Sequence, residues 1–160
     1  MARISNRHTP LIAVLLGLLV AVLAARVGPA HAADAVQKQD TNVSGVVAEL
    51  VECKREDGQL TIKMRLVNTG DKEASVYAIA SRNFDAYYLT AASKKYFILR
   101  DSEKTPLAPQ ADSGGSVHTR IPKGGSWTWW AKYPAPPADV KKLSYFTPLT
   151  APFDNVPIKD

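Results

Sequence analysis

Polar and apolar side chains alternate strictly in one segment of this chain, and this alternation limits the folds that are open to it. In the eight residues from Gln59 to Leu66, every second residue is leucine, isoleucine or methionine, and the residues between them are polar or charged. This period of two is typical of a β-strand with one buried face, because successive side chains of a strand point to opposite sides. The valine-rich segment 43–53 comes before it, and Asp57-Gly58 lies between the two. Because Asp-Gly tolerates the positive φ angles of tight turns, the sequence predicts a β-hairpin here.

The rest of the chain beyond this hairpin predicts more short strands and no helix. Turn-forming clusters such as Asp112–Ser116 separate the segments, and no window of about a dozen residues shows helical periodicity. Ala91–Lys95 predicts a second hairpin. About seven to nine strands at this spacing favour an all-β antiparallel β-sandwich, with a small barrel as the alternative. The further predicted strands are Ser75–Ala80, Tyr87–Thr90, Tyr96–Arg100, Val117–Ile121, Trp127–Tyr133, Lys142–Thr147 and Asn155–Ile158.

The first 32 residues have the organisation of a secretory signal peptide. Arg3 and Arg7 precede the segment Leu11–Ala25, which consists of apolar residues and glycine, and Ala30-His31-Ala32 gives an A-x-A cleavage site. An apolar segment of this length is short for a helix that must cross about 30 Å of hydrocarbon. We therefore predict a cleaved leader and no membrane span after cleavage, with an uncleaved anchor as the alternative.

This leader defines the predicted domain organisation and location. Residues 1–32 form the signal peptide, residues 33–41 are polar and aperiodic and predict a flexible N-terminal tail, and residues 42–160 form the β-sandwich. Export through a signal peptide places the protein in the periplasm or outside the cell.

The charge of the exported part argues against nucleic acid as a partner. Three of the 20 basic residues lie in the leader, which leaves 17 basic residues against 15 acidic ones. A protein that neutralises a run of phosphates needs a surplus of lysine and arginine, and this chain has almost none. We therefore predict no nucleic-acid binding.

The inventory of reactive side chains argues against an enzyme. After the leader, His118 is the only histidine and Cys53 the only cysteine, too few ligands for a zinc site. The sequence also has no G-x-S-x-G elbow, no phosphate-binding glycine loop and no dinucleotide fingerprint. We predict no catalytic residues, no metal and no cofactor, with a hydrolase built on His118 as the alternative. Cys53 is expected to be buried in a strand, and the alternative is an intermolecular disulfide.

The tryptophan-rich strand suggests where a partner could bind. Its alternation places Trp127 and Trp129 on one face and Trp130 and Lys132 on the other, which is otherwise polar. We expect the first face to enter the core, and the second to leave Trp130 on the surface unless a neighbouring strand or the following prolines cover it. Trp130 and Lys132 are therefore candidate partner-binding residues.

Tyr88 beside the second hairpin is a third candidate for partner binding, although tyrosines in such strands commonly turn the ring inward.

Together these features predict a non-catalytic exported binding module of the cell envelope, whose partner is an envelope protein or a glycan. The alternative is a carbohydrate-binding module that uses an exposed aromatic platform.

Three segments resemble exported bacterial immunoglobulin-like domains. They are Tyr96–Asp101 (YFILRD), Trp130–Pro137 (WAKYPAPP) and Pro152–Ile158 (PFDNVPI), and the likeness covers roughly residues 43–158. Similar domains occur as modules ahead of peptidoglycan-binding domains of the outer-membrane protein A type and, in general form, as secreted mycobacterial immunoprotective antigens. The resemblance implies an immunoglobulin-like β-sandwich, no known enzymatic activity and no catalytic residues.

Overall fold

The structure, a computed structural model, describes residues 35–160. This part of the chain is all-β: it contains ten strands, one short 3₁₀ turn and no α-helix. None of its elements is a helix long and apolar enough to span a membrane. The predicted signal peptide lies outside the described residues. The strands are β1 (Gln37–Asp40), β2 (Val46–Glu56), β3 (Gln59–Asn68), β4 (Ala74–Ile79), β5 (Tyr88–Ala91), β6 (Lys94–Phe97), β7 (Val117–Ile121), β8 (Ser126–Pro134), β9 (Lys142–Phe146) and β10 (Phe153–Pro157), and the 3₁₀ turn η1 is Phe84–Ala86.

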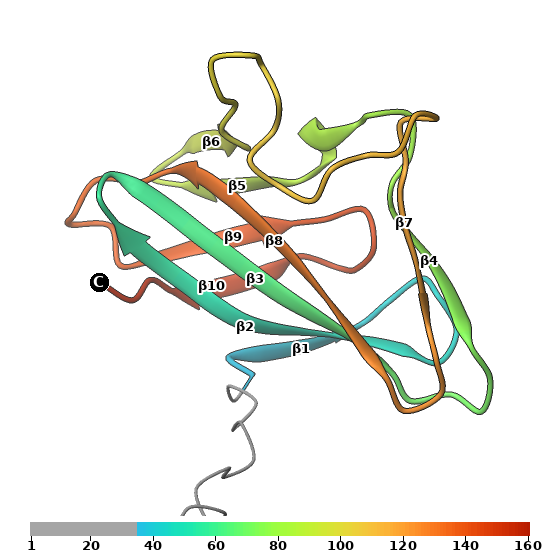
Figure 1. Cartoon of the computed structure of the whole chain (residues 1–160). Coiled ribbons are helices and arrows are strands. Elements are labelled where there is room, and N and C mark those ends of the chain that lie inside the picture. Colours follow the sequence, from blue (N-terminus) through green and yellow to red (C-terminus); the bar gives the residue numbers. More distant parts are fainter. Residues whose placement is uncertain (1–34) are drawn as a thin grey trace, which may run out of the picture. The chain divides into compact units, whose positions relative to one another are not determined.

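The strands form three antiparallel sheets. Four strands pair in the order β1-β2-β3-β8, four in the order β10-β9-β5-β6, and β4 pairs with β7 as a separate two-stranded ribbon. In Figure 1, β2, β3 and β8 run side by side across β9 and β10, and the β4–β7 ribbon stands to one side. The two predicted hairpins are confirmed, since β2 pairs with β3 and β5 pairs with β6.

A single hydrophobic core collects the inward side chains of all three sheets. Its largest members are aromatic and have no exposed surface, and they contact one another between the two four-stranded sheets. Trp129 of β8 stacks on Tyr87 at a centroid distance of 4.2 Å. Tyr133 of β8 meets Tyr145 of β9 edge-on at 6.4 Å, and Tyr145 stacks on Phe153 of β10. Burial of each such ring removes about 150–250 Å² from water and is a main source of stability.

The N-terminal tail predicted for residues 33–41 is wrong for residues 37–40, which form strand β1. The segment has no apolar alternation, but its backbone pairs with β2 from Gln37 to Asp40. Its glutamine side chains also donate hydrogen bonds to β10 and to the residue before it: Gln37 Nε2 to the carbonyl of Asp154 at 2.8 Å, and Gln39 Nε2 to the carbonyl of Pro152 at 3.1 Å. Backbone pairing and side-chain amides therefore hold a polar strand that hydrophobic patterning does not reveal.

Two predicted strands are displaced from their expected positions. The segment Tyr96–Arg100 forms a strand only up to Phe97, because the chain then leaves the sheet, and the N–H of Leu99 donates to the carbonyl of Lys132 in β8. The last strand begins at Phe153 rather than Asn155, and its pairing with β9 is interrupted by an irregularity between Phe153 and Val156.

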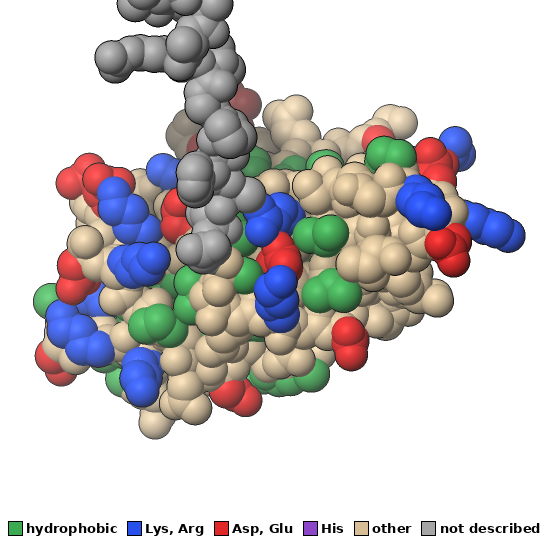
Figure 2. Space-filling model, turned by 90° about the horizontal axis from the view of Figure 1, so that it is seen from below, with side chains coloured by type: hydrophobic (Ala, Val, Ile, Leu, Met, Phe, Trp, Pro, Cys, Tyr) green, Lys and Arg blue, Asp and Glu red, His purple; other side chains and the backbone are tan. Residues whose placement is uncertain are grey.

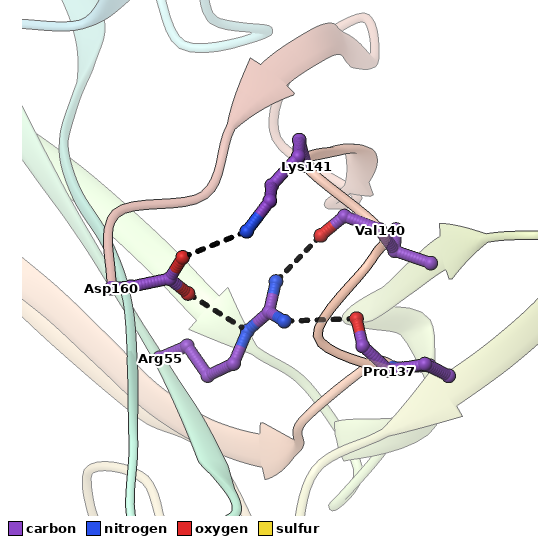
Figure 3. A network of polar contacts seen from close by, with 5 residues as sticks. All are labelled: Arg55, Pro137, Val140, Lys141 and Asp160. Atoms are coloured by element: carbon purple, nitrogen blue, oxygen red, sulfur yellow. Dashed lines mark hydrogen bonds and ion pairs between the residues drawn. The ribbon is translucent and has the colours of Figure 1, made fainter.

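A half-buried arginine joins β2 to the last residues of the described chain (Figure 3). The side chain of Arg55 is 11% exposed. Its guanidinium donates to the carbonyl of Val140 at 2.6 Å and to the carbonyl of Pro137 at 2.8 Å, and its Nε lies 3.3 Å from a carboxylate oxygen of Asp160. Lys141 donates to the other oxygen of Asp160 at 3.0 Å, and these cations lower the pKa of that carboxyl. Because guanidinium donors are satisfied by carbonyls, this contact fixes the chain before β9 against β2.

A second charged cluster joins the first three strands. The carboxylate of Glu49 in β2, on a residue only 8% exposed, contacts Lys38 of β1 at 2.6 Å and receives a hydrogen bond from Nε of Arg65 in β3 at 2.8 Å. The hydrogen bond from Lys38 is the largest influence on the pKa of Glu49 and, with Arg65, lowers it against the opposing effect of burial.

We expect this cluster to make stability depend on pH in the acid range. Because the pKa of Glu49 is lowered on folding, its stabilisation is present above the unfolded-state pKa and is lost as the pH falls through the folded-state value. The free energy of unfolding should therefore fall between about pH 6 and about pH 3 by more in the wild type than in Glu49→Gln, by on the order of 1 kcal/mol. Urea denaturation at both pH values measures this difference. Equal losses of unfolding free energy in the wild type and in Glu49→Gln would show that Glu49 is not the source of this pH dependence.

Candidate functional site

Trp130 is the exposed aromatic residue of β8, as its place in the alternation predicts. It is 38% exposed, whereas Trp129 beside it has no exposed surface and Trp127 is half-buried against the core. Lys132, two residues further along β8, is half-buried on the same face. The predicted division of this strand into a core face and a surface face is therefore confirmed.

The surroundings of Trp130 are polar and charged. Lys63 of β3 lies opposite Trp130 across the ladder, and Thr61 lies opposite Lys132. The Nζ of Lys63 is 2.9 Å from a carboxylate oxygen of Glu52, so its charge is paired. An indole ring in such a setting offers an apolar face and an N–H donor, and the neighbouring side chains offer a hydroxyl, ammonium groups and a carboxylate.

The position of Lys132 is fixed by the long segment that follows β6. Its N–H donates to the carbonyl of Leu107 at 3.0 Å, and its carbonyl accepts from the N–H of Leu99 at 2.8 Å. Since both backbone groups of Lys132 point to this side of β8, those of Trp130 point there too, away from β3. Lys132 is therefore held on this side of β8 by the segment after β6, while β8 pairs with β3 on its other side.

Trp130, Lys132, Thr61 and Lys63 form one outer surface, called here the Trp130 surface, and Tyr88 does not belong to it. The neighbouring residues Tyr87 and Trp129 stack on each other in the core, so Tyr88 and Trp130 point away from each other on the outer faces of two different sheets. Trp130 and Lys132 therefore lie on one surface and Tyr88 on another, so the three candidate residues do not form a single aromatic platform. The strand register that separates them is a long-range property that local alternation does not give.

The ring of Tyr88 is also occupied on its own sheet. It stacks on Phe146 of β9 with centroids 4.6 Å apart and planes 8° from parallel. The Nζ of Lys95 lies 4.3 Å from the centre of the same ring, and Phe97 of β6 approaches at 6.2 Å. Because these neighbours cover the ring, Tyr88 offers less free surface for stacking than Trp130 does.

His118 lies on the exposed β4–β7 ribbon with two partners that the sequence did not reveal. Its Nε2 is 2.8 Å from the hydroxyl of Ser75, and its ring stacks on Tyr77 at 4.3 Å. These contacts depend on the pairing of β4 with β7, which no local signal predicts. A serine–histidine pair of the hydrolase type also needs an orienting acid. Among residues 35–160, no carboxylate lies within salt-bridge distance of His118, and no group of three or more histidine, cysteine, aspartate or glutamate residues could hold a metal.

Cys53 is buried in β2, as expected. The residue is 1% exposed, and burial, partly opposed by Arg55, raises the pKa of its thiol to about 12. The thiolate is the reactive form of cysteine, so this side chain is protected from oxidation and disulfide exchange in the folded protein. An intermolecular disulfide would require local opening of β2.

The charged side chains are mixed on the face of the molecule shown in Figure 2. On its described part, acidic and basic side chains alternate, and hydrophobic side chains appear as small separate areas. Alternating charges of this kind keep a surface hydrated and offer no extended region of one sign.

Comparisons of the chain with models of protein families, with characterised proteins and with solved structures gave no match. The function therefore has to be argued from the geometry of the site itself. The Trp130 surface is the predicted site that the fold leaves open, while Tyr88 and His118 lie elsewhere.

Proposed function

We propose that this protein is an exported, non-catalytic binding module of the cell envelope, which contacts its partner through the Trp130 surface of β8. The observation that carries the proposal is the exposure of Trp130 between buried or half-buried neighbours. An exposed indole on a polar strand face loses the stabilisation that burial would give it, and indoles are enriched among residues that dominate binding energy. The proposal that the protein is exported is supported by the signal-peptide-like sequence of residues 1–32.

The proposed fold is an immunoglobulin-like β-sandwich of the kind found in exported bacterial domains. Two four-stranded antiparallel sheets with one shared core support a sandwich, because such sheets bury their apolar faces against each other. The resemblance of Trp130–Pro137 to those domains supports the more specific assignment. Under this proposal, β8 and its proline-rich continuation form one face of the module.

The second candidate function is carbohydrate binding by the same surface. It is favoured by the setting of Trp130 among hydrogen-bonding side chains rather than apolar ones, because sugar rings combine an apolar face with hydroxyl groups that pair with polar side chains. The platform would consist of Trp130 with Thr61, Lys63 and Lys132, and would exclude Tyr88. A protein partner and a glycan partner predict different behaviour in the experiment below.

We expect Trp130→Ala to reduce binding of the protein to the envelope fraction of the source organism by at least about tenfold, because truncating a central aromatic contact costs about 2 kcal/mol or more. Co-sedimentation over a range of envelope concentrations measures the affinity. Phe97→Ala is the matched control, since Phe97 is also an exposed aromatic residue, at 45%, but lies on the other four-stranded sheet.

Two outcomes of this experiment would contradict the proposal: unchanged binding by Trp130→Ala, or an equal loss in Phe97→Ala. Treating the envelope fraction with protease distinguishes the two partner classes. Binding that survives protease and is competed by soluble envelope glycans identifies a glycan, and binding that protease abolishes identifies a protein.

A further inference from the structure

A cleft of about 430 Å³ lies at a part of the surface that the Trp130 proposal does not use. It is formed by the turn between β4 and η1 together with the long segment between β6 and β7, which lie at the same end of the described unit (Figure 1). Three of its lining side chains are the cations Arg82, Arg100 and Lys104, and none is acidic. This concentration of positive charge contrasts with the near balance of charges along residues 33–160.

Two of the three cations have no carboxylate partner within residues 35–160. Arg100 lies 3.5 Å from a carboxylate oxygen of Asp85, whereas Arg82 and Lys104 form no ion pair. The carboxylate of Asp101, beside the cleft, is used within its own turn, where it accepts from the N–H groups of Glu103 and Thr105 at 2.9 Å. Arg82 and Lys104 therefore line the cleft as exposed cations without an ion-pair partner among residues 35–160.

The two unpaired cations also stand on unusual backbone. Arg82 has a φ of 57° and Lys104 a φ of 64°, in the left-handed region that glycine or asparagine occupies at lower cost. Residues held in such conformations cluster at functional sites, where side-chain identity matters more than stability. Arg82 and Lys104 therefore occupy turn positions where glycine or asparagine would be less strained.

Local contacts hold the cations at the cleft. A Cβ on Gly115 would come within 2.8 Å of the Cγ of Arg82, so the glycine leaves room for the arginine stem. The Nη1 of Arg100 donates to the carbonyl of Lys104 at 3.1 Å, which ties two cationic residues of the wall together. Phe84 and Pro106 add apolar surface to the lining.

We propose that this cleft binds a small ligand that carries at least two adjacent negative charges, of the phosphate or carboxylate class. The planar guanidinium groups of Arg82 and Arg100 can each donate two N–H hydrogen bonds to two oxygens of a carboxylate or phosphate, and the ammonium of Lys104 adds a third positive charge. The apolar lining accommodates a hydrocarbon or ring portion beside the charged group. The cleft is separate from the Trp130 surface, so binding of an anion in the cleft does not depend on binding of a partner at Trp130.

Titration with pyrophosphate and, separately, with citrate at constant ionic strength tests the proposal. Backbone amide NMR resonances of residues 82–86 and 100–111 should shift in a saturable way, and Arg82→Gln/Lys104→Gln should bind at least tenfold more weakly. Lys72→Gln is the matched control, because Lys72 is an exposed lysine outside the cleft lining. Saturation by one probe alone supports the site and identifies the oxyanion class. Saturation by both probes supports a site that recognises negative charge without distinguishing phosphate from carboxylate.

Absence of saturable shifts with both probes would overturn the proposal, as would equal weakening in Lys72→Gln. A second variant distinguishes loss of the binding site from loss of folding. Lys104→Gly relieves the left-handed backbone, so it should melt at or above the wild-type temperature while binding the anion more weakly. Wild-type anion affinity in that variant would also overturn the proposal, and Trp130→Ala should leave the affinity unchanged.

Discussion

Replacing Trp129 with alanine is expected to lower the free energy of unfolding by about 3–5 kcal/mol, the range typical of truncating a buried tryptophan. Trp129 has no exposed surface, and its ring lies 4.2 Å from that of Tyr87 and 6.4 Å from that of Trp127. The cavity left by the indole would open between the two four-stranded sheets. Since small domains have total stabilities of about 5–15 kcal/mol, much of the population would unfold on mild heating.

Trp130→Ala is the matched control for this prediction, because it removes the same side chain one residue further along β8. We expect it to cost less than about 1 kcal/mol, since the outer face leaves Trp130 substantially exposed. Thermal and urea denaturation of the two variants measure the contrast. A larger loss of stability in Trp130→Ala would show that the faces of β8 are assigned the wrong way round.

The second large effect is expected at Asn68, a buried polar residue at the end of β3 that is 1% exposed. Its amide nitrogen donates to the carbonyls of Lys72 at 2.7 Å and Ile121 at 2.8 Å, and its side-chain oxygen accepts from the N–H of Gly70 at 3.0 Å. Asn68→Asp keeps the shape but replaces the donor with an oxygen that faces two carbonyl oxygens. We expect this change to cost about 2–4 kcal/mol, because both carbonyl acceptors lose their donor and the new carboxylate oxygen that faces them has none.

Asn42→Asp is the corresponding control. Asn42 is exposed, and its amide makes one hydrogen bond, to the carbonyl of Pro148 at 3.2 Å. Its replacement should cost less than about 1 kcal/mol in urea denaturation at neutral pH. Similar losses in the two variants would mean that Asn68 does not join the end of β3 to the chain before β4 and the end of β7.

Alternation in the sequence is sufficient to predict the paired strands of the core. The segments that form β3 and β8 are apolar on one face. A period of two leaves only the choice of face, and in β8 the polar residues Ser126, Thr128 and Lys132 decide it. The hairpin between β2 and β3 also follows locally, because Asp57 and Gly58 adopt φ angles of 50° and 73°.

Contacts between distant segments could not be predicted in the same way. Strand β1 is held by backbone pairing and by glutamines that reach β10, and neither leaves a hydrophobic pattern. The opposite outward directions of Tyr88 and Trp130 depend on which sheet each strand joins. The cationic cleft brings Arg82 of one loop together with Arg100 and Lys104 of another, and no periodicity describes the conformations of these loops.

Oxidative footprinting of the protein with and without the envelope fraction shows whether the outer face of β8 contacts the partner. Hydroxyl radicals modify exposed aromatic rings, and mass spectrometry reports the modification of each residue. In the free protein, Trp130 and Phe97 should be oxidised and Trp129 should not. On binding, Trp130 should become protected while Phe97 remains reactive. Protection of Phe97 with Trp130 still oxidised would contradict the claim that the β8 face meets the partner.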